Sequence, residues 1–141
     1  MPTIPELFQQ LVAAFETRDL PAALDLFAED AVMIDPHYPQ AEMKGKAAIK
    51  QGIEWAFSNI EKPGFTVRHL WTEDDSGVVE VDTHHVFRGG MKVNFPQVFV
   101  METRDGLITR LQSYPPYGPP GIAGLLTGLV RLTWRLQGKM K

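Results

Sequence analysis

The sequence predicts an α+β fold in which N-terminal helices pack on one face of a curved antiparallel sheet. Apolar residues recur at helical spacing in the first sixty positions, whereas residues 65–114 form stretches rich in β-branched and aromatic residues. Helices first and a run of hairpin-linked strands afterwards is typical of an α+β domain. The 141 residues, 44% of them hydrophobic, suffice for one domain with its own core.

Three helices are expected before the strands. The first spans 3–17, the second starts at Pro21 and covers 21–28, and the third covers 45–60. Residues 31–35 form a short apolar strand that ends before a proline, and the following segment up to residue 44 is a loop.

Four strands are expected after the third helix. They cover 65–73, 78–88, 91–103 and 107–114, and their connectors carry the Gly, Asp and Ser residues of hairpin turns. Pro96 lies inside the third of these strands, where it predicts a bulge or a sheet edge.

The last part of the chain is a separate unit. We expect a domain over 1–118 and an extension over 119–141, with a stiff Pro-rich linker over 115–121 and an amphipathic helix over 122–137. Four of the 14 basic residues and none of the 17 acidic residues lie in the extension, which leaves residues 1–118 with a net charge of −7. The helix could cover the domain as a lid, pack in a partner subunit, or make a weak contact with an anionic membrane surface; packing is favoured. The basic residues are Arg131, Arg135, Lys139 and Lys141.

Composition excludes several classes of function. The chain has no cysteine, so thiol catalysis, disulfides and thiolate metal sites are absent. A net charge of −3 argues against nucleic-acid binding. No two of the four histidines have the spacing of a helical or same-face strand pair, so neither a metal nor another cofactor is expected. The N-terminus lacks the pattern of a signal peptide, which favours a cytoplasmic protein.

Three segments carry a family resemblance. The strings RDLPAALDLFAEDAVMIDP, GKAAI and FVMETRDGLITRLQSY resemble the nuclear-transport-factor-2-like superfamily, in particular its ketosteroid isomerase and SnoaL-like polyketide cyclase branches. The resemblance covers residues 4–114. It implies a cone-shaped sheet that encloses an apolar pocket, a small apolar molecule as ligand, and a homodimer formed through the sheet face.

Asp35 and His85 are the candidate catalytic residues. The resemblance places Asp35, at the end of the AVMID strand, where the isomerase branch has its general base. Burial at an apolar mouth raises the pKa of a carboxyl group and suits it to proton transfer. An alternative is that Asp35 only forms a turn ahead of Pro36. His85 would act as acid, base or hydrogen-bond donor, or would simply be a core histidine bonded to a neighbour.

The sequence departs from the isomerase pattern at both oxyanion-binding positions. Alignment with that branch puts Leu11 and Val98 where it has a tyrosine and an aspartic acid. Losing one such donor typically costs about 10²–10³ in turnover, so steroid isomerisation by the usual means is not expected. An epoxide hydrolase is also less favoured, because its charged residues align near Val81, Thr83 and Ser113.

Strand alternation suggests which side chains line the pocket. If Val98 faces inward, so do Leu111 and Ser113 on the next strand, and the Gly89-Gly90 hairpin puts Val81, Thr83 and His85 on the same side. The expected substrate-binding residues are Phe15, His37, Tyr38, His69, Trp71, Val81, Thr83, Val98, Leu111 and Ser113. Trp55 lies off the apolar stripe of its helix and is expected to pack against another segment instead.

Two hypotheses of different classes follow. In the first, the protein is an isomerase, cyclase or lyase in which Asp35 takes a proton next to a carbonyl of an apolar substrate. In the second, it is a non-catalytic domain for apolar-ligand binding or dimerisation, which the aliphatic residues at positions 11 and 98 favour.

Overall fold

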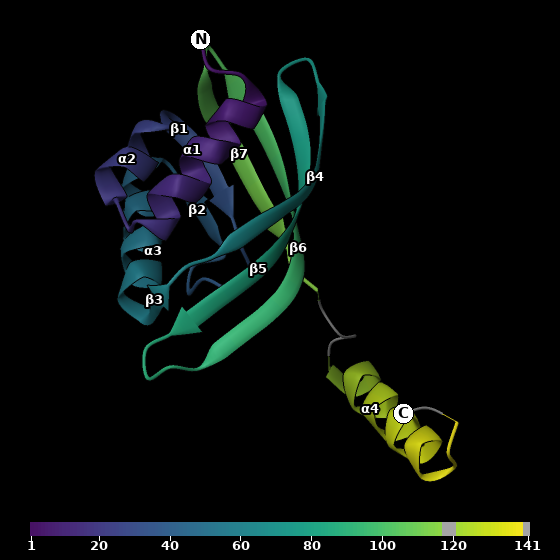
Figure 1. Cartoon of the computed structure of the whole chain (residues 1–141). Helices are drawn as coiled ribbons and strands as arrows, with labels where there is room; N and C mark the ends of the chain where they lie inside the picture. The colour runs from purple at the N-terminus through teal and green to yellow at the C-terminus, as the bar shows by residue number, and fades with distance from the viewer. Residues whose placement is uncertain (117–120, 140–141) are drawn as a thin grey trace.

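The computed structural model describes residues 1–116 and 121–139 and places a layer of helices against a curved sheet (Figure 1). The α+β class expected from the sequence is confirmed. The elements are α1 (Ile4–Glu16), α2 (Leu20–Asp25), β1 (Phe27–Ile34), β2 (Glu42–Lys44), α3 (Lys46–Asn59), β3 (Ile60–Lys62), β4 (Phe65–Glu73), β5 (Ser76–Phe87), β6 (Lys92–Arg104), β7 (Leu107–Tyr114) and α4 (Gly121–Leu136).

The strands form one sheet in the order β2-β1-β7-β6-β5-β3, and β4 also pairs with β5. Neighbouring strands run antiparallel except β1 and β7, which are parallel. The helices α1, α2 and α3 cover one face, so that the sheet curves around them without closing (Figure 1).

Local signals fix where the helices begin. Thr3 and Glu6 form a capping box at the start of α1, in which each side chain accepts a hydrogen bond from the other residue's backbone N–H. The Asp19 carboxylate caps α2. Gly45 precedes α3 with φ of +88°, in the left-handed region that glycine adopts without strain. Each start lies close to its expected position.

Two three-residue strands, β2 and β3, were not expected. β2 pairs with β1, where Met43 lies opposite Met33, and β3 pairs with the end of β5. A three-residue strand is too short to show alternation, and it forms here because a longer neighbour supplies its hydrogen bonds. The second helix is shorter than expected because Phe27 and Ala28 are buried in the sheet instead.

Two β-bulges decide which side chains face the helices, and both overturn expectations. The bulge between Val67 and His69 turns Leu70 inward. His69 and Trp71 therefore lie on the outer face, where their rings stack 4.0 Å apart. Each bulge inserts one residue and so reverses the alternation beyond it.

The second bulge lies where β6 pairs with β7. Glu102 pairs with Arg110 and Thr103 with Ile108, so the inserted residue is Thr109 of β7, and it shifts the register between the two strands by one residue. Phe99 pairs with Ser113 and faces inward, whereas Val98 pairs with Tyr114 and faces away from the helices. The prediction that Val98 lines the pocket is wrong for this reason. The side chains of β6 that line the cavity are Val93, Phe95, Gln97 and Phe99.

The helix α4 lies beyond residues 117–120, which carry part of the expected linker and lie outside the described residues, as does Lys141. It spans 16 residues, and none of its side chains is buried. Among the described residues, no helix has the length and apolarity needed to span a bilayer.

Candidate functional site

An apolar cavity of about 520 Å³ lies between the helices and the inner face of the sheet. Its walls come from α1, the end of β1, α3, the loop after β1, and the inward faces of β4 to β7. Aromatic rings in edge-to-face contact build one wall, with Phe65 at its centre next to Phe15, Phe99 and His85. The other apolar lining residues include Phe8, Leu11, Val12, Met33, Ile34, Ile60, Phe87, Met91, Val93, Phe95 and Leu111.

The exposed lining residues mark the mouth of the cavity. His37, Trp55, Met91 and Pro116 each line it and are each exposed to solvent. The mouth therefore lies between the loop after β1, the C-terminal half of α3 and the β5–β6 hairpin. A ligand would enter there and extend toward the aromatic wall.

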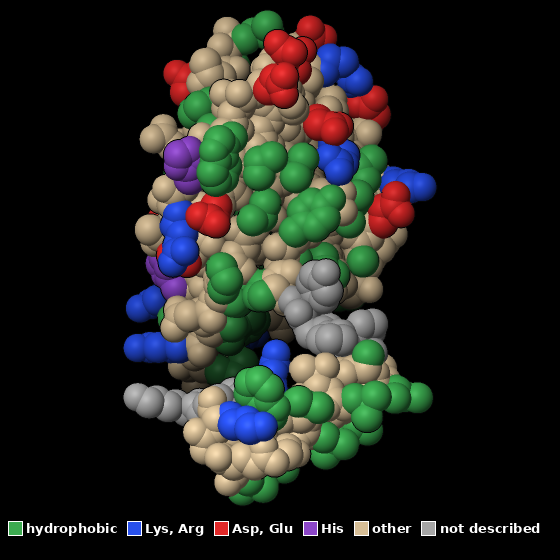
Figure 2. All heavy atoms as spheres, turned by 90° about the vertical axis from the view of Figure 1, so that its right-hand side faces the viewer, with side chains coloured by type: hydrophobic (Ala, Val, Ile, Leu, Met, Phe, Trp, Pro, Cys, Tyr) green, Lys and Arg blue, Asp and Glu red, His purple; other side chains and the backbone are tan. Residues whose placement is uncertain are grey.

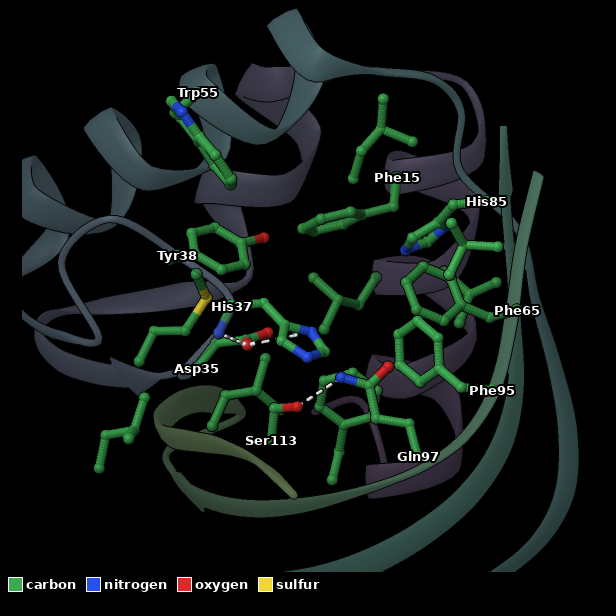
Figure 3. A pocket seen from close by; sticks show the side chains of 18 of the residues that line it. Phe15, Asp35, His37, Tyr38, Trp55, Phe65, His85, Phe95, Gln97 and Ser113 are labelled. Atoms are coloured by element: carbon green, nitrogen blue, oxygen red, sulfur yellow. Dashed lines mark hydrogen bonds and ion pairs between the residues drawn. The ribbon is translucent and has the colours of Figure 1, made fainter. Parts of the chain in front are cut away.

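Asp35 follows the last residue of β1 and is buried, with 8% of its surface exposed. One carboxylate oxygen accepts the backbone N–H of His37 at 2.9 Å, so Asp35 does form the turn that was the alternative interpretation. The same side chain lines the cavity (Figure 3). Burial raises the pKa of this carboxyl group, opposed by the His37 N–H and by the His37 ring. Asp35 is the one lining residue with an acidic side chain among those described.

Tyr38 brings a hydroxyl group into the cavity from the loop after β1 (Figure 3). Its ring packs against Trp55, with ring centroids 5.6 Å apart, and lies over Gly52 of α3. A Cβ at position 52 would lie 2.3 Å from the Met43 sulfur and 3.2 Å from the Tyr38 ring, so glycine is what lets this ring approach the helix. Burial, and then the Asp35 carboxylate, raise the pKa of the Tyr38 hydroxyl, which therefore remains a hydrogen-bond donor.

His85 faces the cavity from β5, across from Tyr38 (Figure 3). Its Nδ1 accepts the backbone N–H of Gly64 at 3.1 Å, so the proton of the neutral ring sits on Nε2. Burial lowers the pKa of His85 to about 4, with smaller contributions from His84 and His37. At neutral pH His85 is thus an uncharged donor, neither a base through Nδ1 nor a cation.

A buried chain of hydrogen bonds crosses β5, β6 and β7. The Thr83 hydroxyl donates to Gln97 Oε1 at 2.7 Å, and the Gln97 amide donates to the Ser113 hydroxyl. Gln97 and Ser113 line the cavity, whereas Thr83 lies beneath them and Val81 is fully buried in the core. These hydrogen bonds give the buried polar side chains of Thr83, Gln97 and Ser113 their partners, and none of the three is an acid or a base.

The structure brings together many of the residues expected at the site. Phe15, His37, Tyr38, Leu111 and Ser113 line the cavity with Asp35 and His85, while His69, Trp71 and Val98 do not. Trp55 packs against another segment, as expected, namely the Tyr38 ring of the loop after β1. It also lines the cavity, which was not expected.

Sequence reasoning missed Gln97 because the connection between β5 and β6 is one residue longer than the expected two-residue Gly89-Gly90 hairpin. The backbone N–H of Phe87 bonds to the carbonyl of Met91, and this turn pairs Val81 with Gln97 and Thr83 with Phe95. Since the odd-numbered residues of β5 face inward, so do those of β6.

Comparisons with known proteins agree with this architecture. Residues 8–111 match the family model of the SnoaL-like domain. The chain belongs to the SnoaL-like family. It is 30% identical over 115 residues to the uncharacterized protein YesE of Bacillus subtilis, covering 77% of this chain and 78% of that protein.

Solved structures show the same fold. A hypothetical protein with a ketosteroid isomerase-like fold from Catenulispora acidiphila, in complex with trimethylamine, matches this SnoaL-like chain with a TM-score of 0.71 and 26% identity, over 79% of this chain and 86% of that one. An NTF2-like protein of unknown function from Burkholderia pseudomallei matches with a TM-score of 0.73 and 17% identity, over 82% and 92% of the two chains. The expected resemblance to nuclear-transport-factor-2-like proteins is confirmed.

Proposed function

We propose that this SnoaL-like protein catalyses proton transfer next to a carbonyl group of an apolar, cyclic or polyketide-like small molecule. The observation that carries the proposal is the presence of three complementary groups on one apolar cavity. Asp35 is a carboxylate with a raised pKa, and Tyr38 and His85 are uncharged donors that face each other across the cavity (Figure 3). The proposed hydrogen-bond donors lie at other positions than those of the isomerase branch. The position where that branch has its tyrosine is occupied here by Leu11 of α1, which has no donor.

The proposed reaction divides the work between these groups. Asp35 removes a proton from the carbon next to the carbonyl, the electron pair of the broken C–H bond forms a carbon–carbon double bond, and the carbonyl oxygen becomes an enolate. Tyr38 Oη and His85 Nε2 donate hydrogen bonds to that oxygen. The protonated Asp35 then returns its proton to the same or another carbon of the enolate, which makes the step an exchange or an isomerisation.

The apolar lining strengthens each of these interactions. A hydrogen bond to a developing negative charge is worth more where water is excluded. The raised pKa of Asp35 moves it toward the pKa at which a carboxylate both takes and returns a proton efficiently.

Exchange of a model ketone tests the chemistry directly. The bicyclic ketone 2-tetralone is incubated with the protein in D₂O, and loss of its C1 protons is followed by NMR. We expect acceleration over buffer, and a loss of about 10²–10⁴-fold of that acceleration in Asp35→Asn. Asp25→Asn, the same chemical change at an exposed position at the end of α2, serves as the matched control and should behave as wild type. Equal exchange by wild type and Asp35→Asn would contradict the role of Asp35.

A second candidate function is binding of an apolar compound without chemistry. The aliphatic Leu11 and the turn-forming hydrogen bond of Asp35 favour it. Saturable quenching of Trp55 fluorescence by 2-tetralone, without any acceleration of exchange, would identify this function. An epoxide hydrolase gains no support, because Val81 and Thr83 lie beneath the lining and Ser113 is held by Gln97.

We further propose a homodimer formed through the outer face of the sheet. Figure 2 looks onto this face, where hydrophobic side chains gather in the middle of the body. Trp71, Val78 and Val100 are neighbours across β4, β5 and β6, and Tyr114 lies beside Val98. Trp71 and Tyr114 are 53% and 49% exposed. Such a patch is typical of a protein interface. Sedimentation velocity should show a dimer that Trp71→Asp dissociates; a monomeric wild type would contradict the proposal.

A further inference from the structure

The helix α4 carries a broad aliphatic face that remains exposed in the described structure. At about 100° per residue, its large aliphatic residues fall within an arc of roughly 160° around Leu129. All of them are between 52% and 80% exposed, and no residue of α4 is buried. They are Ile122, Leu125, Leu126, Leu129, Val130, Leu132 and Leu136.

The charges of the extension have one sign. Arg131 and Arg135 lie on the side of α4 opposite Leu129, and Lys139 follows the helix. Residues 119–141 contain no acidic residue, although the chain has 17. Trp134 lies between the aliphatic and the basic sides, the place that an indole ring takes at a boundary between hydrocarbon and water.

The length of α4 sets how it could meet a bilayer. Its 16 residues span about 24 Å, which is less than the roughly 30 Å of a hydrocarbon core. Since one side carries arginines, the helix is suited to lie in the interface with its aliphatic side down. A helix packed on a protein also has an apolar stripe, of at least about 100°, so it is the one-signed charge opposite this face that favours an anionic bilayer.

We propose that α4 binds the surface of an anionic lipid bilayer. The aliphatic face enters the boundary between headgroups and acyl chains, Arg131 and Arg135 meet the phosphate and headgroup charges, and Trp134 lies at the border. The chain leaves the cavity wall at Pro116, shortly before α4 begins, so a bound helix tethers the cavity mouth to the membrane. This proposal goes beyond the chemistry proposed for the cavity and does not depend on it.

Co-sedimentation of the full-length protein with vesicles tests the proposal. Vesicles of phosphatidylcholine with one quarter phosphatidylglycerol should bind the protein, and vesicles of phosphatidylcholine alone should bind it much more weakly. Since each basic residue near an anionic surface contributes about fivefold, the double variant Arg131→Gln/Arg135→Gln should bind the anionic vesicles about 25-fold more weakly. Raising the salt to 0.5 M should also weaken binding.

Two single variants separate insertion from charge. Leu129→Asp and Thr127→Asp change the net charge equally, but position 127 lies on the polar side of α4. Leu129→Asp should bind at least about tenfold more weakly than Thr127→Asp, because only the first places a carboxylate in the aliphatic face. Equal binding by the two variants would overturn the proposal, as would a wild-type protein that ignores anionic vesicles at low salt.

The alternative partner for the aliphatic face of α4 is a second copy of this chain. Sedimentation velocity without lipid should give Leu129→Asp and wild type the same mass, since the proposal leaves the aliphatic face free in solution. A mass that falls in Leu129→Asp and stays unchanged in Thr127→Asp would show that the face is a subunit interface, and would overturn the membrane proposal.

Discussion

Replacing His85 by asparagine should remove a specific pH dependence from the stability of the fold. His85 lies inside an apolar wall, in edge-to-face contact with Phe65 at 5.1 Å, and its Nδ1 accepts the N–H of Gly64. The folded protein therefore holds the ring neutral, with its pKa lowered from 6.5 to about 4. The asparagine side chain keeps an oxygen that can accept the Gly64 N–H, but it does not titrate.

The magnitude follows from the two pKa values. The unfolded chain takes up a proton near pH 6.5 and the folded protein only near pH 4. As pH falls through this window, the unfolded state binds more protons, so wild type loses stability that is fully present above pH 6.5. A shift of this size corresponds to about 3 kcal/mol in total, and because the ring is partly exposed we expect about 2 kcal/mol to be lost between pH 7.5 and pH 4.5.

Urea denaturation followed by tryptophan fluorescence at several pH values between 7.5 and 4.5 measures this loss. Other titrating groups act in both proteins and cancel in the difference between them. His85→Asn is expected to be less stable than wild type at pH 7.5, because it loses the contact with Phe65. On acidification to pH 4.5 it should lose about 2 kcal/mol less than wild type. Parallel curves for the two proteins, or NMR titration of the His85 ring near pH 6.5, would refute the reasoning.

Three further perturbations test the site. Asp35→Asn should raise the urea midpoint above that of wild type at pH 7 but not at pH 3. The raised pKa of Asp35 means that the folded state disfavours the carboxylate, and this cost appears as pH rises above 3.8. Equal midpoints of the two proteins at pH 7 would argue against burial of the charge. Gly52→Ala should cost about 1–3 kcal/mol of folding free energy, since its Cβ would overlap Met43 and press on Tyr38, whereas Gly128→Ala, with open space around it, should not destabilise; equal effects would dismiss the packing argument. Gln97→Leu should cost about 2–4 kcal/mol of folding free energy, because it leaves the Thr83 and Ser113 hydroxyls without their partner. The triple variant Thr83→Val/Gln97→Leu/Ser113→Ala should recover much of this loss in the same denaturation assay. No recovery would show that the cost has another origin.

Much of the fold could be predicted from the sequence because turn and capping residues set the bounds of its elements locally. The strands 65–73 and 107–114 have the expected bounds because Pro63-Gly64 and Asp105-Gly106 end the neighbouring elements by backbone preference alone. The helix starts at Thr3 and Asp19 follow equally from capping side chains. These features depend on residues only a few positions apart.

The faces of β4 and β6 depend on longer-range pairing. Each bulge is fixed by how two whole strands pair, and one inserted residue exchanges every side chain beyond it. The residue inserted in β4 places His69 and Trp71 on the outer face, against expectation. Thr109, inserted in β7, makes Phe99 rather than Val98 the partner of Ser113, so Leu111 and Ser113 line the cavity as expected and Val98 does not.

The candidate site was predicted only in part, because some of its residues are placed by contacts between distant segments. Asp35 and His85 were predicted from a resemblance and from strand alternation, which are properties of single segments. The role of Tyr38 depends on α3, where the missing side chain of Gly52 makes room for its ring and Trp55 holds it. Only the folded structure brings that loop and that helix together.

A crystal structure of the protein with 2-naphthol, a planar phenol whose hydroxyl resembles an enol, tests the central claim most directly. The account predicts that the rings fill the apolar cavity, that the naphthol oxygen lies within hydrogen-bond distance of both Tyr38 Oη and His85 Nε2, and that a ring carbon faces the Asp35 carboxylate. A naphthol bound with its oxygen at the mouth near Met91, or bound outside the cavity, would contradict the account.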